Sequence, residues 1–258
     1  MLGFIRQVGW HTVSNVLELG GIARFGGKLA YETLRPPWRV RRVVDEIYNT
    51  GVLSLAIVLL SGAVVGSVLG LQGYITLERF GAEQSLGGVV GLSLVREFGP
   101  VLTALLVAGR AGSAIAAEIG AMVATEQLDG LRMMSVDPID YVAQPKALAL
   151  MFSMPLLSAL FIVFGLAGGY AVGVGLLGID GGTYITALER NINFSDEVLG
   201  SILKSVVFGA LVALISTWRG YTSAPNSVGV SRATTGAVVQ ASVATLLFDY
   251  IITALWGG

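Results

Sequence analysis

Six charged side chains lie within long apolar stretches of the sequence, and their chemistry sets the first question about function. They are Arg96, Glu97, Arg110, Glu118, Lys204 and Asp249. A single charge near the centre of a bilayer costs about 2.5–3.5 kcal/mol even on the mildest scale, so each of these groups needs a partner or a hydrated cavity. Carboxylates and cations in that setting can form ion pairs, relay protons or line a path for a polar substrate.

The composition places these charges in a membrane protein. Of the 258 residues, 54% are hydrophobic and only 13% are charged, whereas soluble chains carry about 25% charged residues. The net charge of −1 gives no reason to expect nucleic acid as a partner. Because the sequence has no cysteine and a single histidine, His11, it excludes thiolate chemistry and histidine metal clusters. We expect no bound metal.

Five apolar segments are long enough to cross a hydrocarbon core of about 30 Å. They lie near residues 50–75, 98–122, 147–176, 199–219 and 233–256. The sequence therefore predicts an all-α membrane protein with five spanning helices in one membrane domain.

The distribution of Lys and Arg predicts the orientation of these spans. If the N-terminus is cytoplasmic, eleven of these residues fall on the cytoplasmic side, four fall on the other side, and Arg110 stays within a span. Cytoplasmic loops carry the excess of positive charge. We therefore expect a multi-pass protein with a cytoplasmic N-terminus and a C-terminus on the opposite side.

Residues 1–45 differ from the membrane domain, which we place at residues 46–258. The first residues, "MLGFIRQVGWHTVSNVLELGG", are interrupted by polar groups and do not form the continuous apolar core of a cleavable signal. Their apolar residues lie mostly on one side of a helix, with Trp10 and basic residues nearby. That pattern is typical of a helix that lies in the membrane interface.

Small residues recur every four positions in the first two spans. The rows are Gly62, Gly66 and Gly70 in the first span and Ala108, Gly112, Ala116 and Gly120 in the second. Such rows let helix backbones approach closely inside a membrane. Two interpretations stay open, which are packing within one chain and a seam between two copies.

Depth separates the six charges into two groups. Glu97, Lys204 and Asp249, with Arg96, come from three spans and fall in the outer third of the bilayer. We expect a Glu97–Lys204 pair with Asp249 or Arg96 nearby, either as a structural ion pair or as the polar lining of a transport cavity.

The other two charges lie in one helix, with Arg110 near mid-membrane and Glu118 near the cytoplasmic end. They are about 12 Å apart along its axis and about 80° apart around it, too far for a direct pair. We assign both a structural role, with Arg219 or Arg132 as the expected partner of Glu118.

The segment "ATEQLDGLRMMSVDPIDYVAQPK" follows the second span on the cytoplasmic side. Thr125, Glu126 and Asp129 suggest a helix start, with acids at the positive end of the helix dipole. The predicted short amphipathic helix is a docking surface for a partner protein. Its candidate contact residues are Glu126, Leu128, Asp129, Leu131, Met133, Met134 and Asp137.

Two short motifs resemble nucleotide-binding sequences but lack the required context. "GVGLLG", residues 173–178, closes an apolar helix and does not join a strand to a helix. "IARFGGKL" has Ile22 in place of the first glycine of a P-loop and Leu29 in place of its Ser or Thr. We therefore expect no cofactor in this chain, with ATP and Mg²⁺ held by a partner if the system uses them.

Several stretches closely resemble the MlaE permease family, from about residue 45 to the end of the chain. They are "SGAVVGSVLGLQGY", "REFGPVLTALLVAGRAGSAIAAEIG", "ATEQLDGLRMMSVDPIDYV", "KSVVFG" and "GVSRATTGAVVQASVATLLFDYIITAL". Members of that family are the membrane subunits of ABC systems that move phospholipid between the inner and outer membranes of Gram-negative bacteria.

The resemblance implies a homodimer in the inner membrane, with an interfacial N-terminal helix and five spans in each copy. It also implies three kinds of partner, which are a cytoplasmic ATPase (MlaF), a STAS-domain protein (MlaB) and a periplasmic hexameric lipid-binding ring (MlaD). The segment after the second span would be the coupling helix seated on the ATPase. A lipid cavity would include Leu69, Tyr74, Thr76, Leu77 and Phe80 together with Arg96, Glu97, Lys204 and Asp249.

The resulting prediction is a non-catalytic permease subunit for phospholipid. Two other classes remain as alternatives. One is a proton-coupled secondary transporter with Glu97 and Asp249 as a relay, and the other is a membrane scaffold for a periplasmic lipid shuttle.

Overall fold

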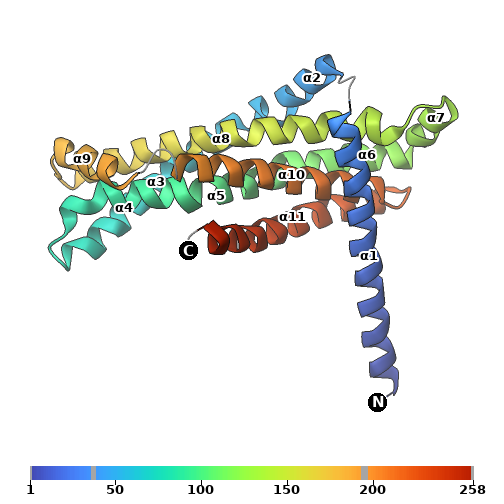
Figure 1. The fold of residues 1–258 in the computed structure, drawn as a ribbon, viewed down its shortest axis with the longest axis horizontal. Coiled ribbons are helices and arrows are strands. Elements are labelled where there is room, and N and C mark those ends of the chain that lie inside the picture. Colours follow the sequence, from blue (N-terminus) through green and yellow to red (C-terminus); the bar gives the residue numbers. More distant parts are fainter. Residues whose placement is uncertain (1, 36–38, 193–196, 257–258) are drawn as a thin grey trace.

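The computed structural model describes residues 2–35, 39–192 and 197–256, with side chains described between residues 16 and 255 of these ranges. Within these ranges the chain is helical with short connections, and they contain no strand. Five helical stretches there are long and apolar enough to cross a membrane. They lie side by side as an elongated bundle (Figure 1). The predicted all-α membrane fold is therefore confirmed.

Each span is built from one or more helices. The first comprises α2 (Val40–Thr50), a short 3₁₀ turn (Val52–Ser54) and α3 (Leu55–Glu78). The second follows a 3₁₀ turn (Glu83–Ser85) and comprises α4 (Leu86–Ser93), α5 (Gly99–Val107) and α6 (Ser113–Ala124). The third is α8 (Gln144–Tyr170), the fourth α10 (Leu199–Tyr221) and the fifth α11 (Ser227–Trp256).

π-helical segments interrupt or extend two of the spans. Leu94–Phe98 joins α4 to α5, and Ala108–Gly112 joins α5 to α6. Ile139–Ala143 precedes α8, and Ala171–Leu176 follows it. A π-turn widens the helix locally and occurs often at functional sites.

The predicted boundaries are too narrow, most clearly for the second span. It covers Glu83–Ala124 in the structure, whereas the sequence placed its start near residue 98. A helix of that length extends about 60 Å at a rise of 1.5 Å per residue, roughly twice the hydrocarbon thickness. The apolar segment of the second span marks the length that matches the hydrocarbon core. The helical span continues beyond this segment at both ends.

One extension ends in a helical pair that the sequence did not predict. α9 (Gly181–Asn191) packs on α4 at one end of the bundle (Figure 1). Its start is capped by Asp180, whose carboxylate accepts a hydrogen bond from the Thr183 backbone N–H at 2.8 Å. Tyr184 is buried between α9 and its neighbours, and this burial raises the pKa of its hydroxyl to about 12.

Both rows of small residues pack within the chain. A Cβ at Gly66 would lie 1.8 Å from the carbonyl oxygen of Gly165 in α8, so α3 and α8 touch backbone to backbone there. A Cβ at Gly112 would lie 2.8 Å from the Ser216 hydroxyl of α10. The contacts of these rows therefore support the first of the two interpretations, packing within one chain.

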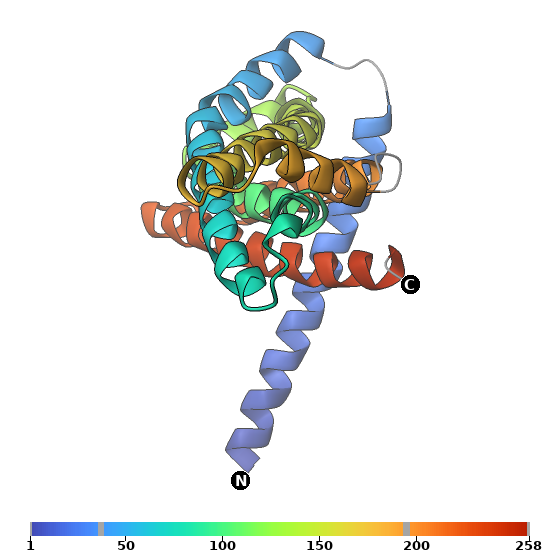
Figure 2. The same ribbon diagram turned by 90° about the vertical axis from the view of Figure 1, so that its left-hand side faces the viewer.

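α1 (Leu2–Leu34) runs across the spans at the end of the bundle that carries α7 (Figure 1), and its N-terminal part projects beyond them (Figure 2). Phe25 packs with ring centroids 5.5 Å from both Trp218 and Tyr221 of α10. If the spans are perpendicular to the membrane, α1 lies roughly parallel to the membrane plane. The interfacial location itself stays a prediction, and the side chain of Trp10 lies outside the description.

Candidate functional site

Lys204 of α10 is the centre of a charged cluster between three elements. Its side chain is only 6% exposed. The ammonium Nζ donates to Glu97 Oε2 at 2.9 Å, to the Arg96 carbonyl at 3.0 Å and to Thr253 Oγ1 at 2.8 Å. Because an ammonium has three N–H donors, these contacts use all of them.

Asp249 of α11 completes the cluster through charge alone. Its Oδ1 lies 3.1 Å from Lys204 Nζ, although no donor of that ammonium remains for it. One cation therefore serves two carboxylates, and the cluster keeps one net negative charge when both are ionised. The guanidinium of Arg96 turns away and lies 3.7 Å from Glu197. The expected proximity of Glu97, Lys204 and Asp249 is thus present, while Arg96 contributes only its backbone.

Local backbone chemistry explains why this carbonyl is available to a side chain. Arg96 and Glu97 lie in the π-helical segment Leu94–Phe98. Pro100, four residues after Arg96, has no N–H and cannot supply the usual helical donor to the Arg96 carbonyl. Lys204 from the neighbouring helix supplies a donor. The "REFGP" sequence carries this signal, since proline frees a carbonyl at a fixed distance before it.

The five positions of the first span and its extension that were expected to line a lipid cavity do not share one environment. Leu69, Tyr74 and Leu77 are half-buried and pack against the core. Thr76 is exposed and donates to the Gln72 carbonyl at 2.9 Å, and Phe80 is 80% exposed. All five lie in or just beyond α3, which packs mainly on α8, whereas the charged cluster lies between the second span, α10 and α11. Their assignment to a cavity stays a prediction.

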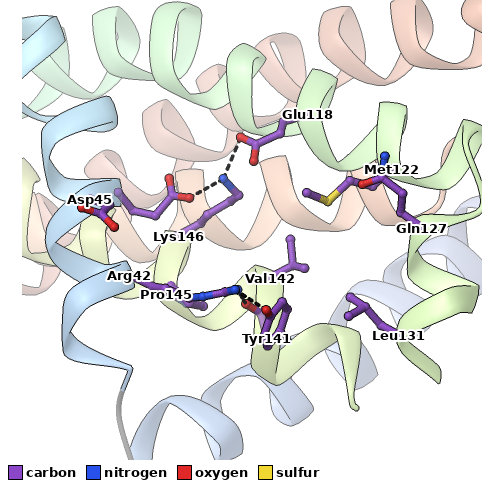
Figure 3. Close-up of a pocket in the computed structure, with 11 residues that line it drawn as sticks. Arg42, Asp45, Glu118, Met122, Gln127, Leu131, Tyr141, Val142, Pro145 and Lys146 are labelled. Atoms are coloured by element: carbon purple, nitrogen blue, oxygen red, sulfur yellow. Dashed lines mark hydrogen bonds and ion pairs between the residues drawn. The ribbon is translucent and has the colours of Figure 1, made fainter. Parts of the chain in front are cut away.

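Glu118 has a different partner from those the sequence suggested. Its Oε2 lies 2.7 Å from Nζ of Lys146, near the start of α8 (Figure 3). Arg219 instead pairs with Glu18 of α1 at 2.6 Å, and Arg132 pairs with Asp129 at 2.5 Å. Lys146 belongs to the same predicted cytoplasmic segment as Arg132, and the sequence does not show which of these cations reaches Glu118.

Arg110 reaches backbone and hydroxyl oxygens of the first span. Its guanidinium donates to the Asn49 carbonyl and, at 3.2 Å, to Ser54 Oγ. Asn49 lies near the end of α2, and Ser54 is the last residue of the 3₁₀ turn that leads into α3. The expected contact with protein oxygen atoms is therefore present, and it joins the second span to the bend in the first.

A short helix follows the second span, as the sequence predicted. α7 (Gln127–Met133) lies at one end of the bundle (Figure 1). Leu128 is 4% exposed and anchors the helix, whereas Met133 and Met134 are 87% and 66% exposed. The helix start expected from Thr125, Glu126 and Asp129 is present, since α7 begins at Gln127, while the Thr125 hydroxyl donates to the Ala121 carbonyl.

The residue immediately before this helix is Glu126. It adopts a left-handed backbone with φ of 59° and makes no side-chain cap bond. The other candidates differ in exposure, since Leu131 is half-buried and packs against the core while Asp129 is exposed and bonded to Arg132.

Asp137 ties α1 to the segment after α7. Its carboxylate pairs with Lys28 of α1 and accepts the Ile139 backbone N–H at 2.9 Å. Burial acts to raise the pKa of Asp137, but the Lys28 ammonium and the Ile139 N–H outweigh it and hold the pKa below its ordinary value. The contact gives Asp137 a role within the chain, apart from its predicted role toward a partner.

The sequence profile described as Permease MlaE matches residues 43–255, which include the charged cluster and all of the five spans except the first three residues of α2 and the last residue of α11. This chain belongs to the MlaE permease family. Together with the five apolar helices, the match makes it a multi-pass membrane protein.

Known relatives of this MlaE-family chain carry related names. The intermembrane phospholipid transport system permease protein MlaE of Haemophilus influenzae is 45% identical over 260 residues, covering 100% of this chain and 99% of the relative. A probable ABC transporter permease protein of Rickettsia typhi is 39% identical, covering 99% of this chain and 98% of the relative. Protein TRIGALACTOSYLDIACYLGLYCEROL 1, chloroplastic, of Arabidopsis thaliana is 33% identical, covering 89% of this chain and 65% of the relative.

Proposed function

We propose that this chain is the membrane permease subunit of an ABC-type transporter that moves phospholipid between the inner and outer membranes of a Gram-negative bacterium. The name of the Haemophilus influenzae relative, which matches along the full chain, supports this function. The chain is placed in the inner membrane with its N-terminus cytoplasmic and its C-terminus periplasmic. It is not itself an enzyme, because ATP and Mg²⁺ belong to the partner ATPase.

The buried cluster of Glu97, Lys204 and Asp249 is the observation that carries the proposal. Charges are retained inside a span when they pair or line a polar path, and here one ammonium is shared by two carboxylates. The cluster lies where the second, fourth and fifth spans meet. It offers a polar contact for a headgroup in an otherwise apolar part of the bundle.

The acyl chains of the lipid need apolar walls, and the bundle exposes them. Leu60 and Val64 of α3 are 69% and 54% exposed, and Leu246 and Leu247 of α11 are 53% and 60% exposed. Two copies of the chain, paired as a homodimer, would enclose such faces around the charged clusters. In that dimer the α3 positions Leu69 to Phe80 would face the headgroup site from the neighbouring copy.

α7 would contact the partner ATPase, and ATP hydrolysis in that partner would displace α7. Its exposed Met133 and Met134 form an adaptable apolar contact of the kind used at protein interfaces. We assign this contact to an MlaF-like ATPase, with an MlaB-like STAS protein bound to that ATPase. An MlaD-like periplasmic ring would receive or deliver the lipid at the opposite end, beside α4 and α9.

Reconstitution tests the proposal. The complex is placed in liposomes, and transfer of a fluorescent phospholipid is measured with and without ATP. Glu97→Gln should abolish most transfer while the complex still assembles and hydrolyses ATP. Asp45→Asn is the matched control, because Asp45 is an exposed acid of α2 outside the charged cluster. Normal transfer by Glu97→Gln would reduce the cluster to a packing role.

The same assay separates the two rival functions. Transfer that continues without ATP but stops when the proton gradient collapses would identify a secondary transporter. Transfer that continues when α7 is cross-linked to α6 would identify a passive scaffold.

A further inference from the structure

A second buried cation connects three spans at the opposite end of the bundle. Lys146, whose side chain is 3% exposed, lies 2.6 Å from Glu46 Oε1 and 2.7 Å from Glu118 Oε2 (Figure 3). Glu46 belongs to α2, Glu118 to α6 and Lys146 to α8. We call these three residues the Lys146 clamp.

The clamp borders a cavity that α7 helps to line. The cavity has a volume of about 340 Å³, and its walls include the three clamp side chains. Gln127 and Leu131 of α7 form part of the same wall (Figure 3). Glu118 lies on α6 six residues before Ala124, and α7 begins at Gln127. A displacement of α7 therefore acts directly on the helix that carries Glu118.

The other arm of the clamp holds the part of the first span that lies before its bend. Glu46 is in α2, and the 3₁₀ turn Val52–Ser54 separates α2 from α3. Such a turn within a long helix is a position where the helix can bend. Arg110 contacts Asn49 before this turn and Ser54 at its last position. The Arg110 contacts and the Lys146 clamp each join the second span to the first. Of these two connections, the clamp alone also includes the third span.

We infer that Lys146 is a positioning residue that makes α2 move together with α6, α7 and α8, so that force applied at α7 bends the first span. The inference rests on the proposed function, since it needs an ATPase that moves α7. Its physical basis is the cost of separating a buried cation from either carboxylate. The three helices consequently move as one body until the clamp opens.

The test measures two quantities in the complete complex in liposomes, which are phospholipid transferred and ATP hydrolysed. Glu46→Ala removes the α2 arm and Glu118→Ala removes the α6 arm. Asp45→Ala is the matched control, because Asp45 is an exposed acid that lines the same cavity, and the described residues give it no ion pair. If either alanine variant fails to assemble, the isosteric glutamine variant replaces it.

The expected result is uncoupling. Glu46→Ala and Glu118→Ala should each lower the phospholipid moved per ATP by about five-fold or more, the low end of typical coupling between sites, while ATP hydrolysis continues. Asp45→Ala should leave the ratio unchanged. An unchanged ratio in both arm variants, or an equal fall of transfer and hydrolysis, would overturn the inference. Absence of ATP-dependent transfer in the wild-type complex would instead overturn the proposed function.

Discussion

Replacing Lys204 with methionine tests whether the charged cluster is a buried ionic site. Methionine keeps the length of the side chain and removes its charge. Glu97 Oε2 and Asp249 Oδ1 then lose the nitrogen that both contact. Because of that shared contact they lie at most about 6 Å apart, and at an effective dielectric of about 20 their repulsion is about 3 kcal/mol. Removing one partner of a buried ion pair typically costs about 3–5 kcal/mol, so we expect Lys204→Met to destabilise the fold by that amount.

The assay is reversible unfolding in mixed micelles with increasing SDS, followed by far-UV circular dichroism. Arg79→Met is the matched control, because Arg79 is an exposed cation just after α3. Its effect should stay within about 0.5 kcal/mol, as for ordinary surface substitutions. Combining Lys204→Met with Glu97→Gln and Asp249→Asn removes all three charges and should recover most of the lost stability.

Two results would refute this reasoning. One is a loss of unfolding free energy for Lys204→Met no larger than that for Arg79→Met. Removing a buried cation with two carboxylate partners should destabilise the fold more than removing an exposed cation. The other is a triple variant as unstable as Lys204→Met alone, which would show that the loss came from packing and not from unpaired charge. A stable triple variant that no longer transfers phospholipid would assign the charges to transport.

Three further predictions follow from other contacts. Gly66→Ala should destabilise the protein by about 1–3 kcal/mol or more through overpacking against α8. The same unfolding assay measures this loss, with Gly27→Ala as the control because a Cβ there meets open space. Equal stability of the two variants would contradict the prediction. Lys28→Ala should loosen α1 and raise amide hydrogen exchange in residues 20–34. Because Asp137 has a lowered pKa when folded, this contact stabilises the protein above the ordinary carboxyl pKa of about 4 and weakens as the pH falls below it. Protection of these amides, relative to their intrinsic exchange rate at each pH, should therefore fall below that pH, and unchanged protection would contradict the assignment. Tyr184→Phe should leave stability unchanged or raise it, because the buried hydroxyl has no hydrogen-bond partner within the described residues. A loss above about 1 kcal/mol in the unfolding assay would show that this hydroxyl does form a hydrogen bond.

Depth along each span was enough to predict the outer cluster. Lys204 lies about a turn and a half from the start of α10, and Asp249 lies about two turns from the end of α11. Charges at equal depth on neighbouring helices find one another because lipid offers them no other partner. Thr253 was missed because a threonine in a span usually bonds its own helix, and the sequence does not show that it faces a cation.

The contacts of Lys146 and the existence of α9 could not be predicted in this way. The pairing of Lys146 depends on how the start of α8 crosses α2 and α6, and the sequence does not fix that crossing. α9 lies in a segment with mixed polarity, and its helix is stabilised by packing on α4 rather than by an apolar run. The left-handed backbone at Glu126 likewise follows from the geometry of the turn between α6 and α7.

In the proposed transport path, phospholipid headgroups pass the cluster of Glu97, Lys204 and Asp249. The most direct test uses the wild-type complex and a phospholipid with a photoreactive diazirine in its headgroup, with the adducts mapped by mass spectrometry in the presence and absence of ATP. Adducts should concentrate in Leu94–Phe98, in the first turns of α10 and in the last turns of α11, and their levels should change with ATP. Adducts spread evenly around the rim of the bundle and insensitive to ATP would contradict it.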